Sequence, residues 1–311
     1  MIVQPDAAGI AEAVALLRAE SVVAFPTETV YGLGADAFSH QAVGEIYRLK
    51  NRPSWNPLIV HVPTVSAARD LSDCWPGNAD KLAEAFWPGP LTLVVRRAAH
   101  LTGVGADNDT IAIRIPAHPV ALRLLEAAGL PLAAPSANRS ESISPTTAEH
   151  VIRSLPDVPL VLDGGPSSWG IESTVLDLTT DVPTLLRPGA LALRALRDVT
   201  GAIALPDAET ADGAARPSPG MSKRHYAPRA TLILAEDVHD VAADGSVGVL
   251  SYEGFPGDEI LSADPREYAA DLYAALHRLD DSGVTTILVQ EPPRTEDWLA
   301  VRDRLGRAAA K

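Results

Sequence analysis

The stretch Lys50-Asn51-Arg52-Pro53-Ser54-Trp55-Asn56-Pro57-Leu58-Ile59-Val60-His61 joins a helical pattern to a strand-like one. The apolar residues before it recur at helical spacing until Pro53 ends the pattern; they are Val43, Ile46 and Tyr47. After it, Leu58 to Val62 is a short β-branched run between prolines, which predicts a strand. Lys50 and Arg52 therefore lie at a rigid corner. They either complement a helix dipole as a solvated helix end or converge on the oxygens of a phosphate.

Composition restricts the classes of protein to which the chain can belong. Its 311 residues are 46% hydrophobic and carry a formal net charge of −14. Residues 1–200 hold 15 Lys and Arg against 21 Asp and Glu, and residues 201–311 hold 11 against 19. Neither part offers the basic surface that a nucleic-acid backbone requires. The single cysteine, Cys74, indicates a reducing compartment, and no apolar run approaches the length of a membrane span. We expect a cytoplasmic protein without strong direct nucleic-acid binding.

Glycines after the first buried strand imitate a nucleotide-binding motif. Val22 to Phe25 reads as a strand, and Gly32-x-Gly34-x-x-Ala37 follows with the spacing of a dinucleotide fingerprint. We reject the match, because the glycines lie well past the strand and no acidic residue follows about 20 positions later. Thr27 and Thr29 in this loop are better candidates, since their hydroxyls stand beside glycines that let a ligand approach the backbone. Ordinary turn chemistry is the alternative.

The segment Thr110 to Pro116 is the clearest strand in the sequence. Its isoleucines share one face, and Thr110, Ala112 and Arg114 share the other. Arg114 therefore stands beside a small side chain, where it either faces solvent or clamps a carboxylate. A clamp would contribute roughly 1.5–3 kcal/mol per charged hydrogen bond.

Two polar clusters follow the next predicted strand. Ser136 and Asn138 come after Leu132 to Ala134, at the strand end where α/β folds bind ligands. Ser144 then precedes Pro145, which predicts a helix that Ser144 caps and Pro145 begins. Because a helix N-terminus also attracts anions, Ser144 could hold a phosphate as well.

The order of predicted elements indicates an α/β protein of two domains. Short successive strands between residues 158 and 187 favour partly antiparallel pairing, so we expect a mixed twisted sheet with flanking helices in residues 1–200. Residues 201–228 are rich in Ala, Pro, Ser and Gly and predict a linker, which nevertheless holds Lys223-Arg224-His225-Tyr226. Residues 229–311 alternate strands and helices, which predicts a smaller, Rossmann-like parallel α/β domain.

Several motifs together resemble the YrdC-like family. They are Pro26-Thr27-Glu28-Thr29-Val30-Tyr31-Gly32-Leu33-Gly34, Lys50-x-Arg52-Pro53, Ser136-x-Asn138, Ser144-Pro145-Thr146 and Glu172-Ser173-Thr174-Val175. Pro219-Gly220-Met221 and His225-Tyr226-Ala227-Pro228 resemble the linker of its long, two-domain members, the threonylcarbamoyl-AMP synthases. The resemblance covers residues 10 to about 230. It departs at Glu141, where glycine is usual, and at Ser167-Ser168-Trp169, where cysteine is frequent.

The resemblance implies an enzyme that makes L-threonylcarbamoyl-AMP and pyrophosphate from L-threonine, bicarbonate or carbon dioxide, and ATP. The product would serve modification of the tRNA adenosine next to the anticodon. The catalytic residues that it implies are Lys50, Arg52, Ser136 and Asn138. Those implied for threonine are Thr29, His61, Arg114, Ala134 and Ser173. Those implied for ATP are Arg52, Asn56, Thr110, Ser136, Ser144, Arg187 and Tyr226, and we expect the linker with Tyr226 to cross the active site as a lid.

The expected partners are these substrates and the downstream tRNA-modifying proteins that accept the adenylate. We expect Mg²⁺ only as the companion of ATP, bridging its phosphate oxygens, and assign it no protein ligands. No tightly bound cofactor is expected. The physical requirement agrees, since nucleotidyl transfer depends on positioning and on cations near the phosphates more than on a covalent nucleophile.

Other functions fit parts of the sequence. A YrdC-type domain could bind structured RNA without catalysis, although the acidic charge disfavours this. YrdC-like domains also occur in larger hydrogenase-maturation proteins, but the zinc-finger and acylphosphatase segments of those proteins are not seen in this sequence. A dinucleotide-dependent oxidoreductase would need a glycine fingerprint in residues 230–311, which the sequence lacks.

Overall fold

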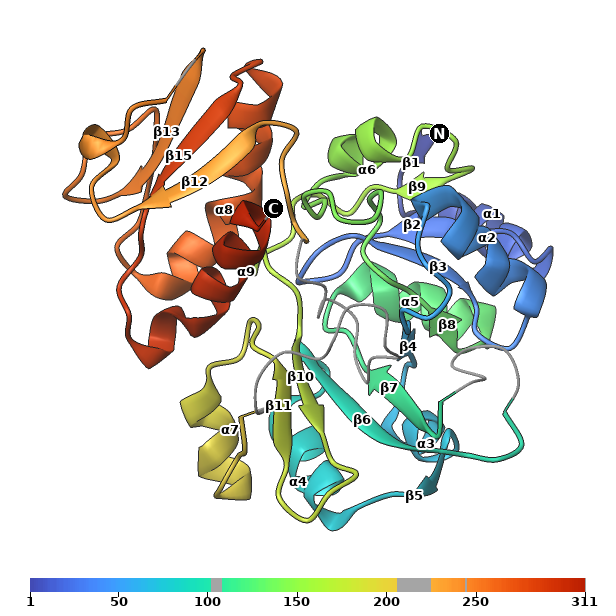
Figure 1. Ribbon diagram of the computed structural model, residues 1–311. Helices are drawn as coiled ribbons and strands as arrows, with labels where there is room; N and C mark the ends of the chain where they lie inside the picture. Colours follow the sequence, from blue (N-terminus) through green and yellow to red (C-terminus); the bar gives the residue numbers. More distant parts are fainter. Residues whose placement is uncertain (102–107, 206–224, 244, 311) are drawn as a thin grey trace.

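The computed structural model describes residues 1–101, 108–205, 225–243 and 245–310, which form two domains side by side (Figure 1). Most of the predicted linker, residues 206–224, lies outside the described residues. The first domain contains β1 (Ile2–Val3), α1 (Ala7–Arg18), β2 (Val23–Phe25), β3 (Gly32–Asp36), α2 (His40–Lys50), β4 (Ile59–His61), α3 (Val65–Arg69), β5 (Ser72–Cys74), α4 (Gly77–Phe86), β6 (Leu91–Arg97), β7 (Thr110–Arg114), α5 (Pro119–Ala128), β8 (Leu132–Ala133), α6 (Ala148–Ser154), β9 (Val161–Leu162), β10 (Thr174–Asp177), β11 (Thr184–Arg187) and α7 (Leu193–Thr200). The second contains β12 (Thr231–Ala235), η1 (Val238–Asp240), β13 (Val247–Tyr252), β14 (Glu259–Leu261), α8 (Pro265–Asp281), β15 (Thr286–Gln290), η2 (Glu296–Trp298) and α9 (Leu299–Ala309).

The first domain is built on a mixed sheet, as the sequence predicts. Its strands run in the order β1-β9-β2-β3-β8-β4-β7-β6-β10-β11, with β5 paired to β6. Strands β4 and β7 are parallel, whereas β6 and β7 are antiparallel. His61 is the last residue of β4 and Arg114 the last residue of β7, and the two are paired in register. Both therefore lie where the carboxyl ends of these strands form one edge of the sheet. This edge positions the site described below.

Alternating side chains on the strands separate the core into layers. Val23 and Phe25 of β2 pack with α1 and α5, while Ala24 joins the larger core on the opposite face. The isoleucines of β7 are buried in that larger core, as predicted, and Ala112 faces the other way. A small apolar cluster on this other face comprises Ile59, Val94, Ala112, Val175 and Leu186. The cluster forms a floor from which Arg114 projects.

Two local predictions are wrong. The glycines predicted in a loop lie in strand β3, where Gly34 leaves room for Phe25; a Cβ there would come within 2.6 Å of the Phe25 ring. Ser144 caps no helix, because α6 begins at Ala148 and Thr147 caps it by accepting from the His150 amide. The Ser144 hydroxyl instead donates to the buried carboxylate of Glu172, whereas a capping hydroxyl would accept from a helix N–H.

The second domain packs its helices against the first. Its sheet is parallel in the order β12-β15-β13-β14, as predicted, and α8 and α9 lie between this sheet and the first domain (Figure 1). The apolar core of this domain continues into the first through Val30, Ile143 and Ile171. Backbones also meet directly: at Gly170, with φ +68°, an added Cβ would lie within 2.5 Å of the carbonyl oxygen of Ala269 in α8. The domains are therefore closely packed.

Two histidines stack where the domains meet. His150 of α6 and His277 of α8 have ring centroids 3.8 Å apart, and Nε2 of His277 lies 3.2 Å from the carbonyl oxygen of Ser144. Burial and the neighbouring imidazole lower the pKa of His150 to about 3. Burial lowers the pKa of His277 to about 4. Both rings are therefore neutral at pH 7.

Acid is expected to destabilise this contact. A histidine whose pKa is lower in the folded than in the unfolded state takes up a proton on unfolding. The contribution of such a histidine to the free energy of unfolding is therefore complete above a pH of about 6.5. It is lost as the pH falls toward the pKa of the histidine in the folded protein. We expect Tm to fall between pH 6.5 and 4, and to fall less in His277→Gln. Thermal unfolding over this range checks the prediction, with His40→Gln at the exposed start of α2 as control. Equal declines in both variants would contradict it.

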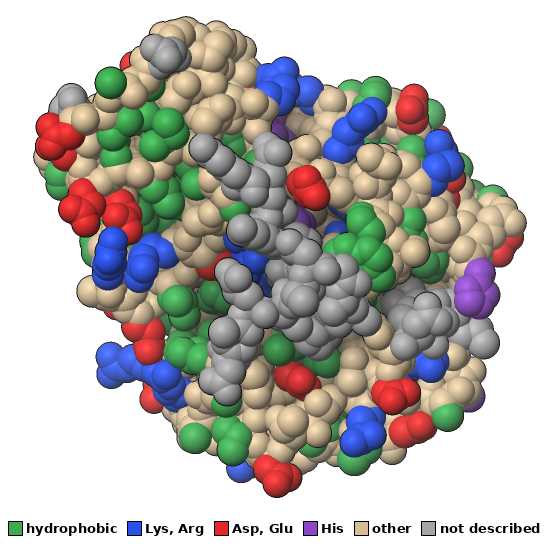
Figure 2. Space-filling model, in the orientation of Figure 1, with side chains coloured by type: hydrophobic (Ala, Val, Ile, Leu, Met, Phe, Trp, Pro, Cys, Tyr) green, Lys and Arg blue, Asp and Glu red, His purple; other side chains and the backbone are tan. Residues whose placement is uncertain are grey.

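Charged side chains of both signs are interspersed over the face of the molecule seen in Figure 2. No helix in the described ranges is long and apolar enough to span a bilayer.

Candidate active site

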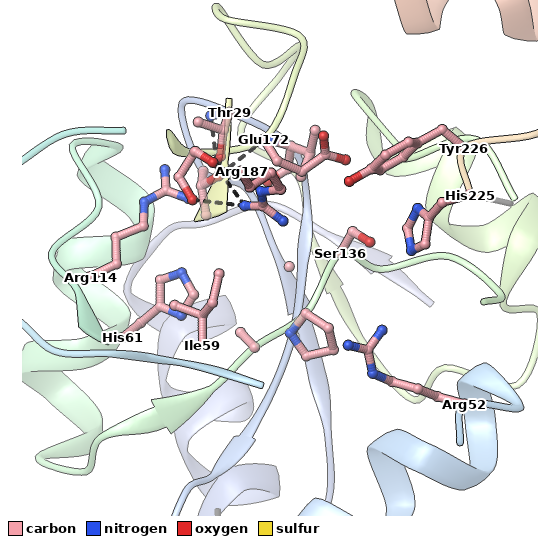
Figure 3. A pocket seen from close by; sticks show the side chains of 16 residues that line it. Thr29, Arg52, Ile59, His61, Arg114, Ser136, Glu172, Arg187, His225 and Tyr226 are labelled. Atoms are coloured by element: carbon pink, nitrogen blue, oxygen red, sulfur yellow. Dashed lines mark hydrogen bonds between the residues drawn. The ribbon is translucent and has the colours of Figure 1, made fainter. Parts of the chain in front are cut away.

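A hollow of about 530 Å³ opens at the edge where β4 and β7 end (Figure 3). The described residues that form its walls come from eight separate segments of the chain. The lining residues are Thr27, Thr29, Val30, Gly32, Arg52, Ile59, His61, Arg114, Ala134, Pro135, Ser136, Glu172, Ser173, Arg187, His225 and Tyr226. Nine of the residues predicted for threonine, ATP or catalysis are among them.

Arg114, His61 and Ile59 lie together at one end of the hollow (Figure 3). The Arg114 guanidinium is fixed by Glu28, at 2.7 Å from Nη2, and by the carbonyl oxygen of Gly89, at 3.3 Å from Nε. Its position on the sheet edge and its charge suit a carboxylate of a small ligand. Burial, and then Arg114, lower the pKa of His61 to about 3, so this imidazole is neutral at pH 7. Thr29 and Ser173, also predicted for threonine, line the same hollow.

Arg52 lies at the other end with Ser136, His225 and Tyr226 (Figure 3). Nη2 of Arg52 donates to Oδ1 of Asn56 at 2.6 Å and to the carbonyl oxygen of Pro57 at 2.9 Å. Burial lowers the pKa of Arg52 to about 10, which leaves the guanidinium charged at pH 7. A buried cation with neutral partners is suited to receive an anion such as phosphate.

Arg187 lies between the two ends and projects from β11 toward the middle of the hollow (Figure 3). Its Nη2 donates to the carbonyl oxygen of Ser173 at 2.9 Å and to Oγ of the same serine at 3.1 Å. The Ser173 hydroxyl also contacts Thr92 at 2.8 Å. The described residues therefore give the hollow three guanidinium groups, which together favour a ligand with several negative charges.

Five predicted site residues do not line the hollow. Lys50 is fully buried behind it, where Nζ donates to the carbonyl oxygens of Ser136 and Asn138 at 2.6 and 2.5 Å. Burial, and then Arg52, hold the pKa of Lys50 well below its usual value. Lys50 thus fixes the loop that carries Ser136. Three of the other four contact neighbouring protein groups: Asn138 donates to Ser142, Asn56 accepts from Arg52, and Ser144 donates to Glu172. Thr110 lies at the far end of β7, where it pairs with Arg96 of β6.

The linker predicted to cross the active site reaches the hollow at His225 and Tyr226. The Ala227 amide donates to the carbonyl oxygen of Glu141 at 2.7 Å, which ties this part of the linker to the first domain. Glu141 itself has φ +70°. This left-handed conformation explains why glycine is usual at that position in the resembled family.

Glu172 is the functional candidate that sequence reasoning missed. Although it belongs to the Glu172-Ser173-Thr174 motif, its partners come from distant parts of the chain. Its carboxylate accepts from Ser144 at 2.5 Å, from Tyr273 at 3.0 Å and from Arg304 at 2.7 Å. Burial opposes its ionisation, but Arg304 and Arg187 outweigh burial and lower the pKa of Glu172 to about 2. No sequence signal identifies Tyr273 or Arg304, which are ordinary residues of amphipathic helices.

The described residues near this hollow offer few carboxylates that could bind a metal ion. Among the residues that the structure describes, no three His, Cys, Asp or Glu side chains are grouped as metal ligands would be. The carboxylate of Glu172 already has partners from three other side chains.

Comparisons with known proteins place the chain in a family. Residues 15–189 match the Sua5, YciO and YrdC family model, described as telomere recombination. Residues 191–310 match the model described as threonylcarbamoyl-AMP synthase, C-terminal domain.

Similar proteins agree with the family models. A Bacillus subtilis protein named threonylcarbamoyl-AMP synthase is 44% identical over 321 residues, covering 96% of this chain and 92% of its own. The crystal structure of Pyrococcus abyssi Sua5 complexed with L-threonine has a TM-score of 0.88 and 38% identity, covering 96% of this chain and 94% of that one. A Mycobacterium tuberculosis relative is 40% identical over 195 residues, covering 62% of this chain and 89% of its own. The chain therefore belongs to the threonylcarbamoyl-AMP synthase family, as a long member that has the C-terminal domain as well as the YrdC-like one.

Proposed function

We propose that the protein joins L-threonine, bicarbonate or carbon dioxide, and ATP into L-threonylcarbamoyl-AMP, releasing pyrophosphate. One observation carries the proposal: a single hollow contains Arg114 at one end and Arg52 at the other, with Arg187 between them. An amino-acid carboxylate and a triphosphate are the two anions that such an arrangement suits. The names of the Bacillus and Pyrococcus relatives support the same reaction.

Threonine fits the end that contains Arg114. The carboxylate would pair with this guanidinium, and the predicted contacts from Thr29, His61 and Ser173 line the surrounding wall. The neutral His61 ring packs edge-on against Phe25, with ring centroids 6.2 Å apart, so its orientation is fixed before a ligand arrives. The L-threonine complex of the Pyrococcus relative supports this amino acid as the substrate.

ATP fits the end that contains Arg52. Ser136 and Tyr226 line this end, and Arg187 lies where phosphates would approach the threonine. Contacts of Asn56, Ser144 and Thr110 with ATP, and a direct catalytic part for Lys50 and Asn138, stay predictions. We expect Mg²⁺ to enter with the nucleotide, held by phosphate oxygens, since Glu172 is the one carboxylate among the described residues that line the hollow.

The chemistry requires positioning and charge. The threonine amine bonds to carbon dioxide and releases a proton to solvent, which gives a carbamate. A carbamate oxygen then bonds to the α-phosphorus of ATP as the bond to the pyrophosphate leaving group breaks. Arg52 and Arg187 would stabilise the charge that develops on the phosphates. Their burial strengthens this interaction.

The adenylate would pass to other proteins that modify tRNA next to the anticodon, in the cytoplasm. The overall negative charge and the interspersed charges of the visible face support an indirect connection to tRNA (Figure 2).

A pyrophosphate assay tests the proposal. Purified protein is incubated with ATP, Mg²⁺ and bicarbonate, and pyrophosphate is followed with and without L-threonine. We expect release that depends strictly on threonine, together with a threonylcarbamoyl-AMP mass in the product. Tight, salt-dependent binding of tRNA without pyrophosphate release would favour a YrdC-type RNA-binding module instead.

A further inference from the structure

Arg304 of α9 belongs to the second domain, yet it contacts the wall of the active site. Its side chain is 1% exposed and is the largest fully buried one in the part of the chain that the structure describes. Nε donates to the Glu172 carboxylate at 2.7 Å. The guanidinium also lies over the ring of Tyr226, 4.9 Å from its centroid, in a cation–π contact. Glu172 and Tyr226 both line the hollow, whereas Arg304 does not.

Tyr273 of α8 contacts the same two residues. Its hydroxyl donates to Glu172 at 3.0 Å, and its ring stacks on Tyr226 with centroids 5.8 Å apart. One carboxylate and one aromatic ring of the active site are therefore each held by two side chains of the second domain. This double contact fixes both the position and the tilt of Tyr226.

Simple stabilisation does not account for a buried guanidinium at this place. Burying an ion pair costs desolvation energy, and packed apolar residues of equal volume often stabilise a fold as well or better. Nη2 of Arg304 also lacks a hydrogen-bond partner among the described residues. What a guanidinium adds is direction, since it bonds a carboxylate along fixed N–H vectors and lies flat on an aromatic ring. The positive charges of Arg304 and Arg187 both act on the Glu172 carboxylate. Because Arg304 balances the charge of Glu172, the charge of Arg187 remains available to a ligand.

We propose that Arg304 is a positioning residue through which the second domain orders the nucleotide end of the active site, by holding Glu172 and Tyr226. The proposal rests on the proposed function, in that this end binds ATP. The Mycobacterium relative, whose match of 195 residues covers 89% of its length, has little room for a second domain. An arginine on a domain that some relatives have little room for fits a role in positioning the site better than a direct role in the reaction.

The test compares three variants of the full chain. Arg304→Met removes the charge and the directed bonds while keeping an unbranched side chain. Arg304→Lys restores the charge. Arg197→Met is the matched control, because Arg197 of α7 pairs with Glu296 across the same domain boundary but at the exposed surface, at 2.6 Å. KM for ATP and for threonine is measured from pyrophosphate release, and Kd for a non-hydrolysable ATP analogue is measured by calorimetry.

We expect Arg304→Met to raise KM and Kd for the nucleotide at least tenfold and to leave KM for threonine within about twofold. Arg304→Lys should recover part of this loss, and Arg197→Met should match the parent. Equal increases for both substrates, or no increase for nucleotide, would overturn the proposal.

If Arg304→Met fails to fold, a second variant, Arg304→Met with Glu172→Gln, removes the arginine and its buried partner Glu172 together. The other carboxylate bonded to Arg304, that of Asp303, keeps its bond from Arg307. The double variant should fold and still bind the ATP analogue at least tenfold more weakly, because Tyr226 has lost its support; parental affinity would overturn the proposal. Absence of threonine-dependent pyrophosphate release in the parent protein would contradict the proposed function alone. The calorimetric comparison of nucleotide binding would then still decide the role of Arg304.

Discussion

Replacing Arg114 by alanine is expected to raise KM for threonine by two orders of magnitude or more, with little change in KM for ATP. The substitution removes the charged hydrogen bonds to the threonine carboxylate, worth roughly 1.5–3 kcal/mol each. Two such bonds amount to about 3 kcal/mol or more, and each 1.4 kcal/mol is about tenfold in affinity. ATP binds at the other end of the hollow, so its binding should be spared (Figure 3). Pyrophosphate release at varied threonine and ATP checks the split.

The same substitution also affects stability, and the experiment must separate the two effects. Arg114 and Glu28 form an ion pair in which both side chains are at most 7% exposed. Removing only the arginine leaves a buried carboxylate without its cation, which costs about 3–5 kcal/mol. The double variant Arg114→Ala with Glu28→Gln avoids this, so its Tm should exceed that of Arg114→Ala. Its KM for threonine should stay high. Recovery of the parental KM in the double variant would mean that Arg114 does not bind the substrate.

Local patterns in the sequence predict the parts of the site that lie on regular strands. The alternation in Thr110 to Arg114 places the isoleucines in the core and Arg114 on the opposite face, as observed. The pattern is reliable there because period-two alternation fixes the face of a strand regardless of its neighbours. Thr110 shows its limit: it shares the face of Arg114 but lies at the other end of β7. A face can be predicted, whereas the position of a pocket along it depends on other segments.

Long-range contacts decide the parts that the sequence does not predict. Ser144 has the local signature of a helix cap, yet its hydroxyl binds Glu172, which is 28 residues away in the chain. Arg304 lies 132 residues from the same carboxylate. The motif of Lys50 likewise gives no sign that its side chain donates to the backbone of the Ser136 loop, 86 residues away. Propensity and spacing carry no information on such partners, because these contacts arise only when distant segments of the chain pack together.

Replacing Arg52 by methionine is expected to lower kcat/KM for ATP by about 10²–10³, without loss of stability. A preorganised donor aimed at charge that develops in the transition state contributes roughly 3–4 kcal/mol. In contrast to Arg114, the recorded hydrogen-bond partners of Arg52 within the described ranges are neutral, namely Asn56 and Pro57. Removing Arg52 therefore leaves no buried carboxylate without its cation. It also relieves the desolvation of a guanidinium that is only 8% exposed.

The two arginines thus give opposite expectations for Tm: a decrease in Arg114→Ala, and an unchanged or higher value in Arg52→Met. Thermal unfolding and pyrophosphate kinetics on the same samples measure both, with Arg48→Met as the control for a lost cation on exposed α2. A protein that keeps a binding site for anions at the expense of its own stability should become more stable when that site is neutralised. A marked decrease of Tm in Arg52→Met would show that the bonds to Asn56 and Pro57 hold the loop in place. Arg52 would then be a structural residue of that corner, and the phosphates would depend on Arg187.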